Sequence, residues 1–158
     1  ALITGCAATC DAYDQVAPEP SGAAERAAAE LALQRSGRSP EDVGGIWLHG
    51  TATRSGDPAE LKALDPLGRA AGRGLPATAS KGATGHMLGA SGAVELALAV
   101  GCLERGVLPA VTNLRQPIGE GAVALVRGDP AALREPSCLV LSAGFGGHCG
   151  AVIVEVNH

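Results

Sequence analysis

The segment from about Met87 to Arg105 constrains the fold more than any other part of the sequence. Its pattern is helical, and the residues are small and apolar on nearly every side, including Gly89, Gly92 and Ala93. A helix that is apolar all round must be covered by protein over most of its surface. We therefore expect a buried helix inside a layered structure rather than a helix on the surface.

Strand-like and helical segments alternate around this helix. The expected strands are residues 1–8, 43–48, 75–79, 123–126, 138–141 and 151–156, and the other expected helices are 23–36 and 57–67. Asp57 is the expected N-cap of the second of these helices, with Pro58 at its first position. Residues 9–22 and 80–85 are expected to be loops. Alternating strands and helices, followed by two closing strands, predict a layered α/β fold in one domain.

Composition limits the core and the classes of partner. Aromatic residues make up only 2% of the chain, which has 23 glycines, so the core must consist of Ala, Val, Leu and Ile with closely packed backbones. A net charge of −4 argues against a general nucleic-acid binder. No apolar run is long enough to span a membrane and no secretion signal is visible, so we expect a cytoplasmic protein. The odd number of cysteines, without CxxC spacing, argues against a zinc site or a complete disulfide framework. They are Cys6, Cys10, Cys102, Cys138 and Cys149.

The first chemical motif is HGTAT at residues 49–53, followed by GDP at 56–58 and by Glu60. A histidine at the carboxyl end of a strand occupies the place where α/β sheets present functional side chains. The hydroxyls of Thr51 and Thr53 could both donate to one extended polar ligand. A buried histidine in an ordinary strand-to-loop turn would give the same local pattern.

The second motif is SKGATGH at residues 80–86. His86 comes just before the long apolar helix, where the positive end of the helix dipole favours a neutral imidazole that can donate a hydrogen bond. Lys81 lies five residues earlier, in a glycine-bearing loop that could turn toward the same pocket. A solvent-exposed lysine and a histidine that caps a helix would be the purely structural interpretation.

The third motif is SAGFGGH at residues 142–148. It holds the only phenylalanine of the chain, Phe145, between glycines whose backbone can adopt unusual conformations. Such an aromatic can swing, or its backbone N–H can point into a site. The same sequence would also suit a simple tight turn between two strands.

The order and spacing of these motifs resemble the C-terminal half of elongating β-ketoacyl–acyl carrier protein synthases. That family carries HGTxT…GDxxE, KxxTGH and GFGG in this order, and the opening with Gly5, Asp11 and Gly22 is also similar. The resemblance covers residues 1–158 but only about half of a complete synthase. It implies a thiolase-like fold, in which two similar α/β halves pack as five layers.

The resemblance also implies roles for individual residues. His49 and His86 would hold the thioester carbonyl of malonyl–acyl carrier protein during decarboxylative condensation, where two N–H donors stabilise the developing enolate. Lys81 would organise the pocket, with Glu60 as its acidic neighbour. Thr51 and Thr53 would contact the phosphopantetheine arm. Phe145 would be the gating aromatic, with its backbone N–H contributing to an oxyanion hole.

No metal or nucleotide cofactor is implied. The expected partners are the acyl carrier protein and the N-terminal half, or a separate subunit, that carries the nucleophilic cysteine. The complete enzyme is expected to be a dimer. None of the five cysteines lies in the setting of that nucleophile, so this chain alone is not expected to perform the condensation.

Several positions depart from the family pattern. Ala52 stands where glycine is usual, and Arg54-Ser55 replaces a common Pro-Leu. Ala143 stands where a second phenylalanine is usual, and Cys149 where an asparagine is common. The last two changes alter the wall of the expected pocket and therefore its preference for acyl chains.

Two other functions fit the sequence. One is a non-catalytic module that binds the carrier protein as a scaffold. The other is a stand-alone malonyl-thioester decarboxylase that uses only the two histidines. Retention of both histidines together with Lys81 and Glu60 disfavours a pure scaffold, because a scaffold needs no donors to a carbonyl oxygen.

Overall fold

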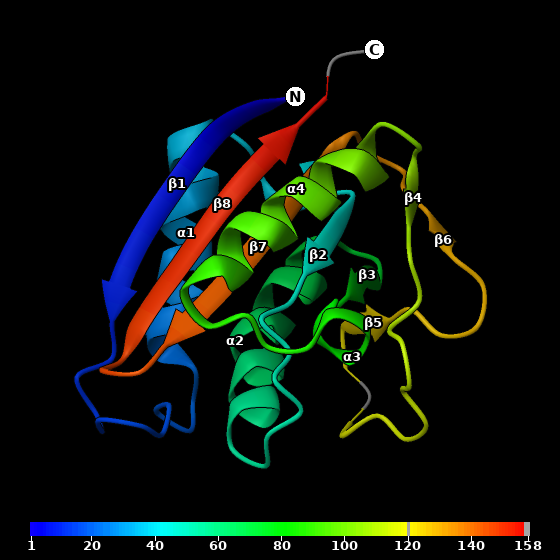
Figure 1. Cartoon of the computed structure of the whole chain (residues 1–158). Helices are drawn as coiled ribbons and strands as arrows, with labels where there is room; N and C mark the ends of the chain where they lie inside the picture. Colours follow the sequence, from blue (N-terminus) through cyan, green and yellow to red (C-terminus); the bar gives the residue numbers. More distant parts are fainter. Residues whose placement is uncertain (120, 157–158) are drawn as a thin grey trace.

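A computed structural model describes residues 1–119 and 121–156, with a mixed β-sheet at the centre (Figure 1). The sheet has six strands in the order β1-β8-β7-β2-β3-β5. They are β1 (Leu2–Cys10), β8 (His148–Glu155), β7 (Ser137–Gly144), β2 (Gly45–Trp47), β3 (Leu75–Thr78) and β5 (Val123–Leu125). The strand β8 is antiparallel to both of its neighbours, β1 and β7, whereas β7, β2, β3 and β5 run parallel.

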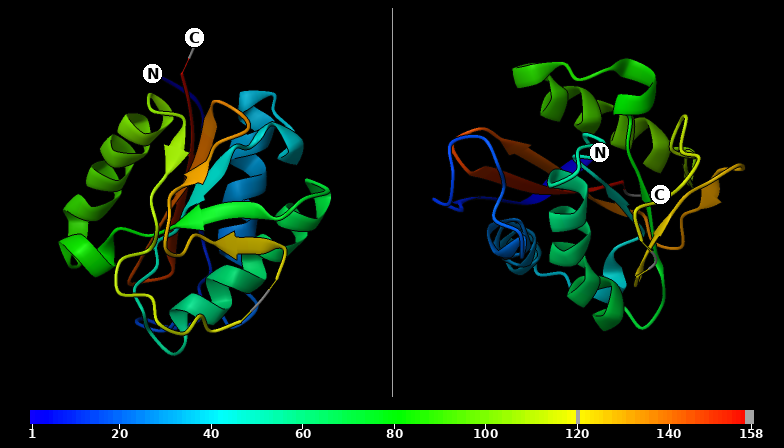
Figure 2. Two further views of the ribbon diagram at one scale, coloured as in Figure 1. Left: turned by 90° about the vertical axis from the view of Figure 1, so that its right-hand side faces the viewer. Right: turned by 90° about the horizontal axis from the view of Figure 1, so that it is seen from below.

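Helices lie on both faces of this sheet (Figure 2). The helices α1 (Ala23–Ser36) and α2 (Gly56–Ala70) cover one face, and α4 (Ser91–Leu103) covers the other. The shorter elements are η1 (Pro40–Asp42), α3 (Lys81–Thr84), η2 (Leu88–Ala90) and a small second sheet of β4 (Val107–Leu108) and β6 (Ala131–Ala132). No helix within the described residues is long and apolar enough to cross a membrane. The layered α/β architecture confirms the fold class expected from the sequence.

The alternation of side chains along β2 divides the core between the two faces. Ile46 belongs to the cluster under α1 and α2, whereas Trp47 packs with Ala99 and Leu103 of α4. Small residues let the layers approach closely. A side chain at Gly5 would place its Cβ 2.1 Å from a backbone oxygen of α1, so only glycine fits there.

Three local predictions were wrong. Residues 80–85 are not all loop, because α3 forms one helical turn there. The helix expected from Met87 to Arg105 runs only from Ser91 to Leu103, because Leu88 has a left-handed φ of 51° that a continuous helix cannot contain. Asp57 is not the N-cap of α2. The N-cap is Ser55 and the first helical residue is Gly56, two residues before the expected first position at Pro58.

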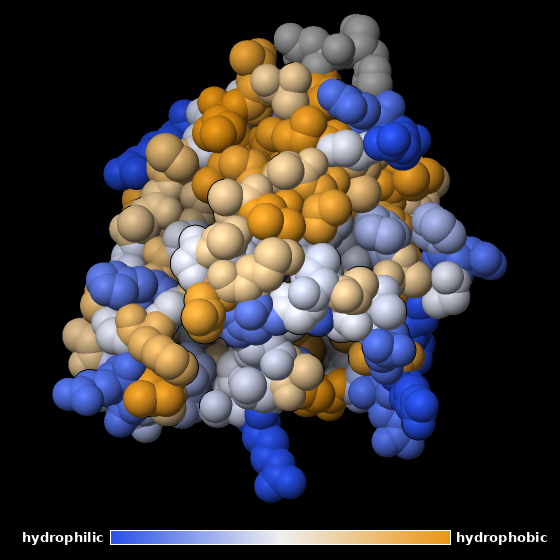
Figure 3. All heavy atoms as spheres, in the orientation of Figure 1, coloured by the Kyte–Doolittle hydropathy of each residue, from blue (hydrophilic) through white to orange (hydrophobic). Residues whose placement is uncertain are grey.

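The helix α4 is buried on one face only, in contrast to the expectation. Its residues at a spacing of four, including Glu95, Ala99 and Leu103, are buried against the sheet, while Leu98 is 39% exposed. Apolar side chains gather over this outer face in the space-filling view (Figure 3). Within the described residues no element covers this face, which accounts for the difference.

Candidate functional site

The three motifs meet at one edge of the sheet. His49 follows β2, Lys81 follows β3 and Phe145 follows β7, and these three strands are parallel neighbours. Because the carboxyl ends of parallel strands lie at the same edge, segments far apart in the sequence come together there. They line a cavity of about 950 Å³, here called the histidine cavity.

The segment after β2 separates this cavity from a second one. His49, Thr51 and Ser55 line the histidine cavity. Leu48, Gly50, Ala52 and Arg54 line the second cavity, which has a volume of about 510 Å³. The backbone of this segment is left-handed at Gly50 and at Ala52, with φ values of 48° and 58°, and its residues are shared alternately between the two cavities. Two residues, Thr53 and Glu60, line both cavities.

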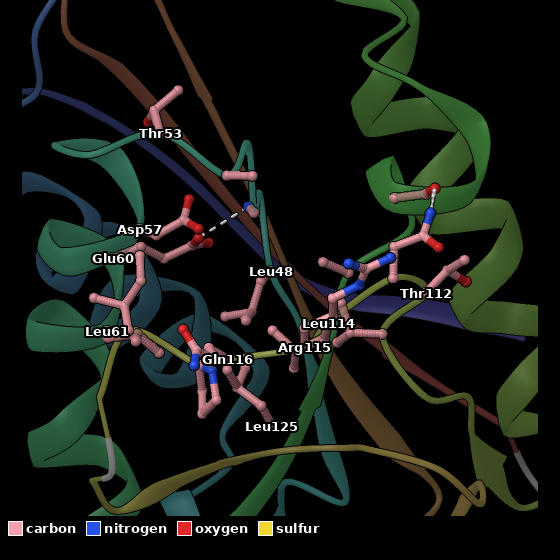
Figure 4. Close-up of a pocket in the computed structure, with 18 of the residues that line it drawn as sticks. Leu48, Thr53, Asp57, Glu60, Leu61, Thr112, Leu114, Arg115, Gln116 and Leu125 are labelled. Carbon is pink, nitrogen blue, oxygen red and sulfur yellow. Dashed lines mark hydrogen bonds between the residues drawn. The ribbon is translucent and has the colours of Figure 1, made fainter.

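Glu60 fixes the start of this segment. Its carboxyl oxygens accept the backbone N–H groups of His49, at 2.6 Å, and of Gly50, at 2.9 Å. Burial raises the pKa of Glu60 to about 8, helped by the nearby Glu25 carboxyl and opposed by the two N–H groups. Figure 4 shows Glu60 between the helix α2 and this backbone. Glu60 is therefore a positioning residue for His49.

The two histidines lie face to edge. Their ring centroids are 5.6 Å apart and the rings are nearly perpendicular, at 85°. The ammonium group of Lys81 lies 3.2 Å from Nδ1 of His49 and also donates to the His49 carbonyl oxygen. Since an ammonium group can only donate, Nδ1 of His49 is the acceptor and Nε2 carries the proton. Burial, followed by Lys81 and His86, lowers the pKa of His49 to about 4, so the ring is neutral.

His86 also carries its ring proton on Nε2, but for a different reason than His49. Its Nδ1 accepts the backbone N–H of Leu88 at 3.0 Å and lies 3.3 Å from the hydroxyl of Ser91. A ring nitrogen that accepts a backbone N–H carries no proton, so Nε2 of His86 is the donor. The turn of η2 that interrupts the expected helix supplies this N–H group. Both imidazoles thus have an Nε2–H available in one cavity.

Lys81 is paired with Glu95, and the expectation that Glu60 is its acidic neighbour was wrong. The Lys81 ammonium lies 2.5 Å from Oε1 of Glu95, with both side chains almost fully buried. Ser80 donates to the same oxygen at 3.3 Å. Burial raises the pKa of Glu95, although the hydrogen bond from Lys81 opposes this. The signal for Glu95 was present in the sequence, because it is the only charged residue of α4.

The hydroxyls of Thr51 and Thr53 lie side by side at the histidine cavity. Oγ1 of Thr51 and Oγ1 of Thr53 are 3.1 Å apart, and Thr53 also accepts the N–H of Gly56 at 3.1 Å. Both residues line the histidine cavity. A polar chain that passes this point can therefore contact both hydroxyls.

Phe145 lies in the tight turn between β7 and β8 and is 75% exposed. The turn needs its glycines, because Gly146 and Gly147 have φ values of 80° and 78°. Two backbone hydrogen bonds, from Gly146 to Gln15 and from Asp11 to Gly147, hold it against the loop after β1. The exposed ring is thus carried on a fixed backbone at the wall of the histidine cavity.

Of the five cysteines, Cys149 lines the histidine cavity. Its side chain is buried, and burial raises the pKa of the thiol to about 12. A thiol with such a pKa is almost never a thiolate at neutral pH and is a poor nucleophile. Ala143, the other position that departs from the family pattern, lines the same cavity.

Sequence reasoning missed two further cavity residues. Glu25 is 8% exposed and its Oε2 has no hydrogen-bond partner among the described residues; burial raises its pKa to about 7. His148 is a third imidazole in the cavity. Glu25 belongs to none of the three motifs, and His148 ends the third motif but was given no role. Within the described residues there is no group of three or more side chains arranged to hold a metal ion.

Comparison with known proteins identifies the family. Residues 1–115 match the model of the β-ketoacyl synthase C-terminal domain. The chain is 38% identical over 147 residues to 3-oxoacyl-[acyl-carrier-protein] synthase 2 of Synechocystis, covering 92% of this chain and 35% of the relative. It is 37% identical over 153 residues to the synthase 2 of Mycobacterium bovis, covering 96% of this chain and 36% of the relative. The chain thus spans little more than a third of the length of these relatives.

Solved structures agree with the sequence relatives. A ketosynthase in complex with its chain length factor, from Xenorhabdus doucetiae, has a TM-score of 0.88 at 34% identity, covering 98% of this chain and 39% of that chain. A type II polyketide synthase acyl carrier protein in complex with its ketosynthase gives a TM-score of 0.91 at 25% identity, covering 99% of this chain and 38% of that chain. The fold is therefore that of the thiolase-like ketosynthases.

Proposed function

The chain belongs to the β-ketoacyl synthase family, and from this premise we propose that it forms the malonyl-binding part of a condensing enzyme. The observation that carries the proposal is the pair of neutral imidazoles, His49 and His86, whose Nε2–H groups are available in one cavity. The relatives named above are 3-oxoacyl-[acyl-carrier-protein] synthases, which makes malonyl–acyl carrier protein the substrate of choice.

The proposed reaction uses the two N–H donors where charge develops. The thioester carbonyl oxygen of the malonyl group accepts both Nε2–H groups, and the C–C bond to the carboxylate breaks to release carbon dioxide. The electron pair of that bond moves into the enolate, whose oxygen gains negative charge. Donors fixed in position stabilise this oxygen more strongly than the ground-state carbonyl. The enolate carbon then attacks an acyl thioester, a C–C bond forms and a thiolate leaves.

Lys81 and Glu95 serve this reaction as positioning residues. Lys81 holds Nδ1 of His49, so the proton stays on Nε2 and the ring stays neutral. Glu95 balances the buried ammonium charge. Thr51, Thr53 and Phe145 line the same cavity, which supports the proposal that the hydroxyls contact the phosphopantetheine arm and the ring gates access.

The acyl thioester is proposed to form on a cysteine outside this chain. The raised pKa of Cys149 disfavours it as the nucleophile. The apolar outer face of α4 is proposed to pack against the part of the enzyme that carries this cysteine, since an exposed patch of this kind marks an interface. We also propose that the acyl carrier protein is a partner, that the complete enzyme is a dimer and that it is located in the cytoplasm.

The test is the release of carbon dioxide from malonyl–acyl carrier protein by the intact gene product, together with any co-purifying subunit. His49→Ala and His86→Ala should each lower the rate about 100- to 1,000-fold, the usual effect of losing one such donor. His148→Ala is the matched control in the same cavity and should leave the rate near that of the wild type. Normal decarboxylation by either of the first two variants would falsify the assignment.

The same experiment separates the alternatives. Carbon dioxide released without C–C bond formation, even with all subunits present, would indicate a stand-alone decarboxylase. Binding of the carrier protein without any turnover would indicate a scaffold. Formation of the elongated β-keto product, dependent on both histidines, supports the condensing enzyme.

A further inference from the structure

The second cavity is a built pocket that the proposed reaction does not use. Its apolar walls come from four parts of the chain: Leu48 after β2, Leu61 in α2, Val111 and Leu114 in the loop after β4, and Leu125 in β5. In Figure 4, Leu61 and Leu48 lie on one side of this space and Leu114 and Arg115 on the other. Its volume of about 510 Å³ is within the range of small-molecule sites.

Two arginines line this apolar space. Arg54 belongs to the segment after β2, and Arg115 belongs to the loop after β4. Among the described residues, neither guanidinium lies within ion-pair distance of a carboxylate. Their charges therefore remain available to a ligand.

Among the described residues, the two carboxyl groups in the same wall, those of Glu60 and Asp57, form no ion pair with these arginines. Both oxygens of Glu60 are occupied by backbone N–H groups, and burial raises its pKa to about 8. Burial also raises the pKa of Asp57. The cavity thus combines an apolar interior with two unpaired cations, and guanidinium groups bind carboxylates with short, charge-assisted hydrogen bonds.

We propose that the second cavity binds an aliphatic carboxylate, with its chain against Leu61, Leu114 and Leu125 and its carboxylate at Arg54 and Arg115. The ligand class is a medium-chain free fatty acid. The site is separate from the histidine cavity, from which it is divided by residues 48–55. The inference depends on the lining of this cavity and not on the proposed condensation.

Calorimetric titration of the intact gene product with hexanoate, octanoate and decanoate at neutral pH tests the proposal. Each added methylene should tighten binding by about fourfold until the cavity is full, the value expected for burial of a CH₂ group. 1-Decanol and decylamine should bind at least tenfold more weakly than decanoate, because they offer no anion to the arginines. Absence of saturable decanoate binding, or equal affinity for decylamine, would overturn the proposal.

Variants locate the site. The double variant Arg54→Gln/Arg115→Gln should weaken the binding of decanoate at least tenfold and leave the binding of 1-decanol unchanged. Leu114→Trp should abolish the binding of both compounds, because its side chain fills the cavity. Arg134→Gln, an exposed arginine outside the cavity, is the matched control and should bind as the wild type does. His86→Ala should also keep full affinity. Loss of binding in His86→Ala, or its retention in Leu114→Trp, would assign the carboxylate to the histidine cavity and refute the proposal.

A covalent readout does not depend on the stability of the variants. A decanoate analogue with a photoreactive diazirine on its chain should label peptides that contain residues 111–118 of the wild-type protein, and excess decanoate should prevent this labelling. Labelling confined to residues 142–150, in the histidine cavity, would contradict the assignment.

Discussion

Lys81 and Glu95 form a buried ion pair 2.5 Å apart. The same ammonium group lies 3.2 Å from Nδ1 of His49, so it connects a charge on α4 to a ring that follows β2. A buried ammonium without a partner is strongly unfavourable. The pair therefore fixes both the charge balance of the site and the tautomer of His49.

Replacing Glu95 should show the cost of an unpaired buried ammonium. We expect Glu95→Ala to lower the free energy of unfolding by about 3–5 kcal/mol, the usual effect of removing one partner of a buried pair. Glu95→Gln should destabilise less, because its amide oxygen can still accept from Lys81. Urea denaturation measures the free energy of unfolding, and the rate of decarboxylation by the intact enzyme measures the function of the site.

Glu104→Gln is the control for this pair, because Glu104 is exposed just after the end of α4. It should change neither stability nor activity. If Glu95→Ala were as stable as Glu104→Gln, the ion pair would not be a structural requirement.

The sequence predicted the order of the main strands and helices, but it predicted neither α3, β4 and β6 nor the partners within the site. His49, Lys81 and Phe145 follow strands that the hydrophobic pattern reveals, and parallel strands bring their carboxyl ends together. The partner of Lys81 could not be predicted in this way. It depends on which face of α4 turns toward the sheet, and a helix that is apolar all round gives no preferred face. Glu95, its only charged residue, was the available clue.

The burial of Glu25 could not be predicted from the sequence for a related reason. Glu25 lies in α1 and is buried at the histidine cavity. Its burial is set by how α1 packs against β1 and α2, which periodicity alone does not specify.

The raised pKa values of two buried carboxyl groups, those of Glu25 and Glu60, predict how the stability of the fold depends on pH. Burial raises the pKa values of Glu25 and Glu60 to about 7 and about 8, above the value of 4.5 for an ordinary glutamate. Because the folded state holds these protons more tightly than the unfolded state, their contribution is fully present below pH 4.5. It is lost as the pH rises through 7 and 8. The free energy of unfolding should therefore fall by a few kcal/mol between pH 5 and pH 8.

Glu25→Gln tests this dependence, because an amide cannot ionise. Urea denaturation at intervals between pH 5 and pH 8 should give a shallower decline for the variant than for the wild type. Glu30→Gln, at an exposed position of the same helix, should keep the wild-type slope. An unchanged slope in Glu25→Gln would mean that Glu25 is not the titrating group.

Phe145→Ala should impair the function of the complete enzyme and leave its folding almost unchanged. The ring is 75% exposed and contributes little buried area, so the free energy of unfolding should change by less than about 0.5 kcal/mol. If the ring gates the cavity, the rate of acyl transfer in the complete enzyme should fall at least tenfold. Single-turnover acylation measures the rate, and Tyr13→Ala, at another exposed aromatic, is the control. An unaltered acylation rate would count against gating.

Ala52 predicts a stabilising substitution within the site segment. Its φ of 58° lies in the left-handed region, where an alanine side chain costs about 1–2 kcal/mol. Glycine removes this strain, but it also adds conformational freedom to the unfolded chain. This second effect cancels about 0.4–1 kcal/mol of the gain in stability. We therefore expect Ala52→Gly to raise the free energy of unfolding by about 0.5–1 kcal/mol. Ala17→Gly, at a loop alanine without a positive φ, has no strain to relieve and should instead lower it by a similar amount. Chemical denaturation of both variants measures the difference, and destabilisation by Ala52→Gly would show that contacts of the alanine methyl group outweigh the backbone strain.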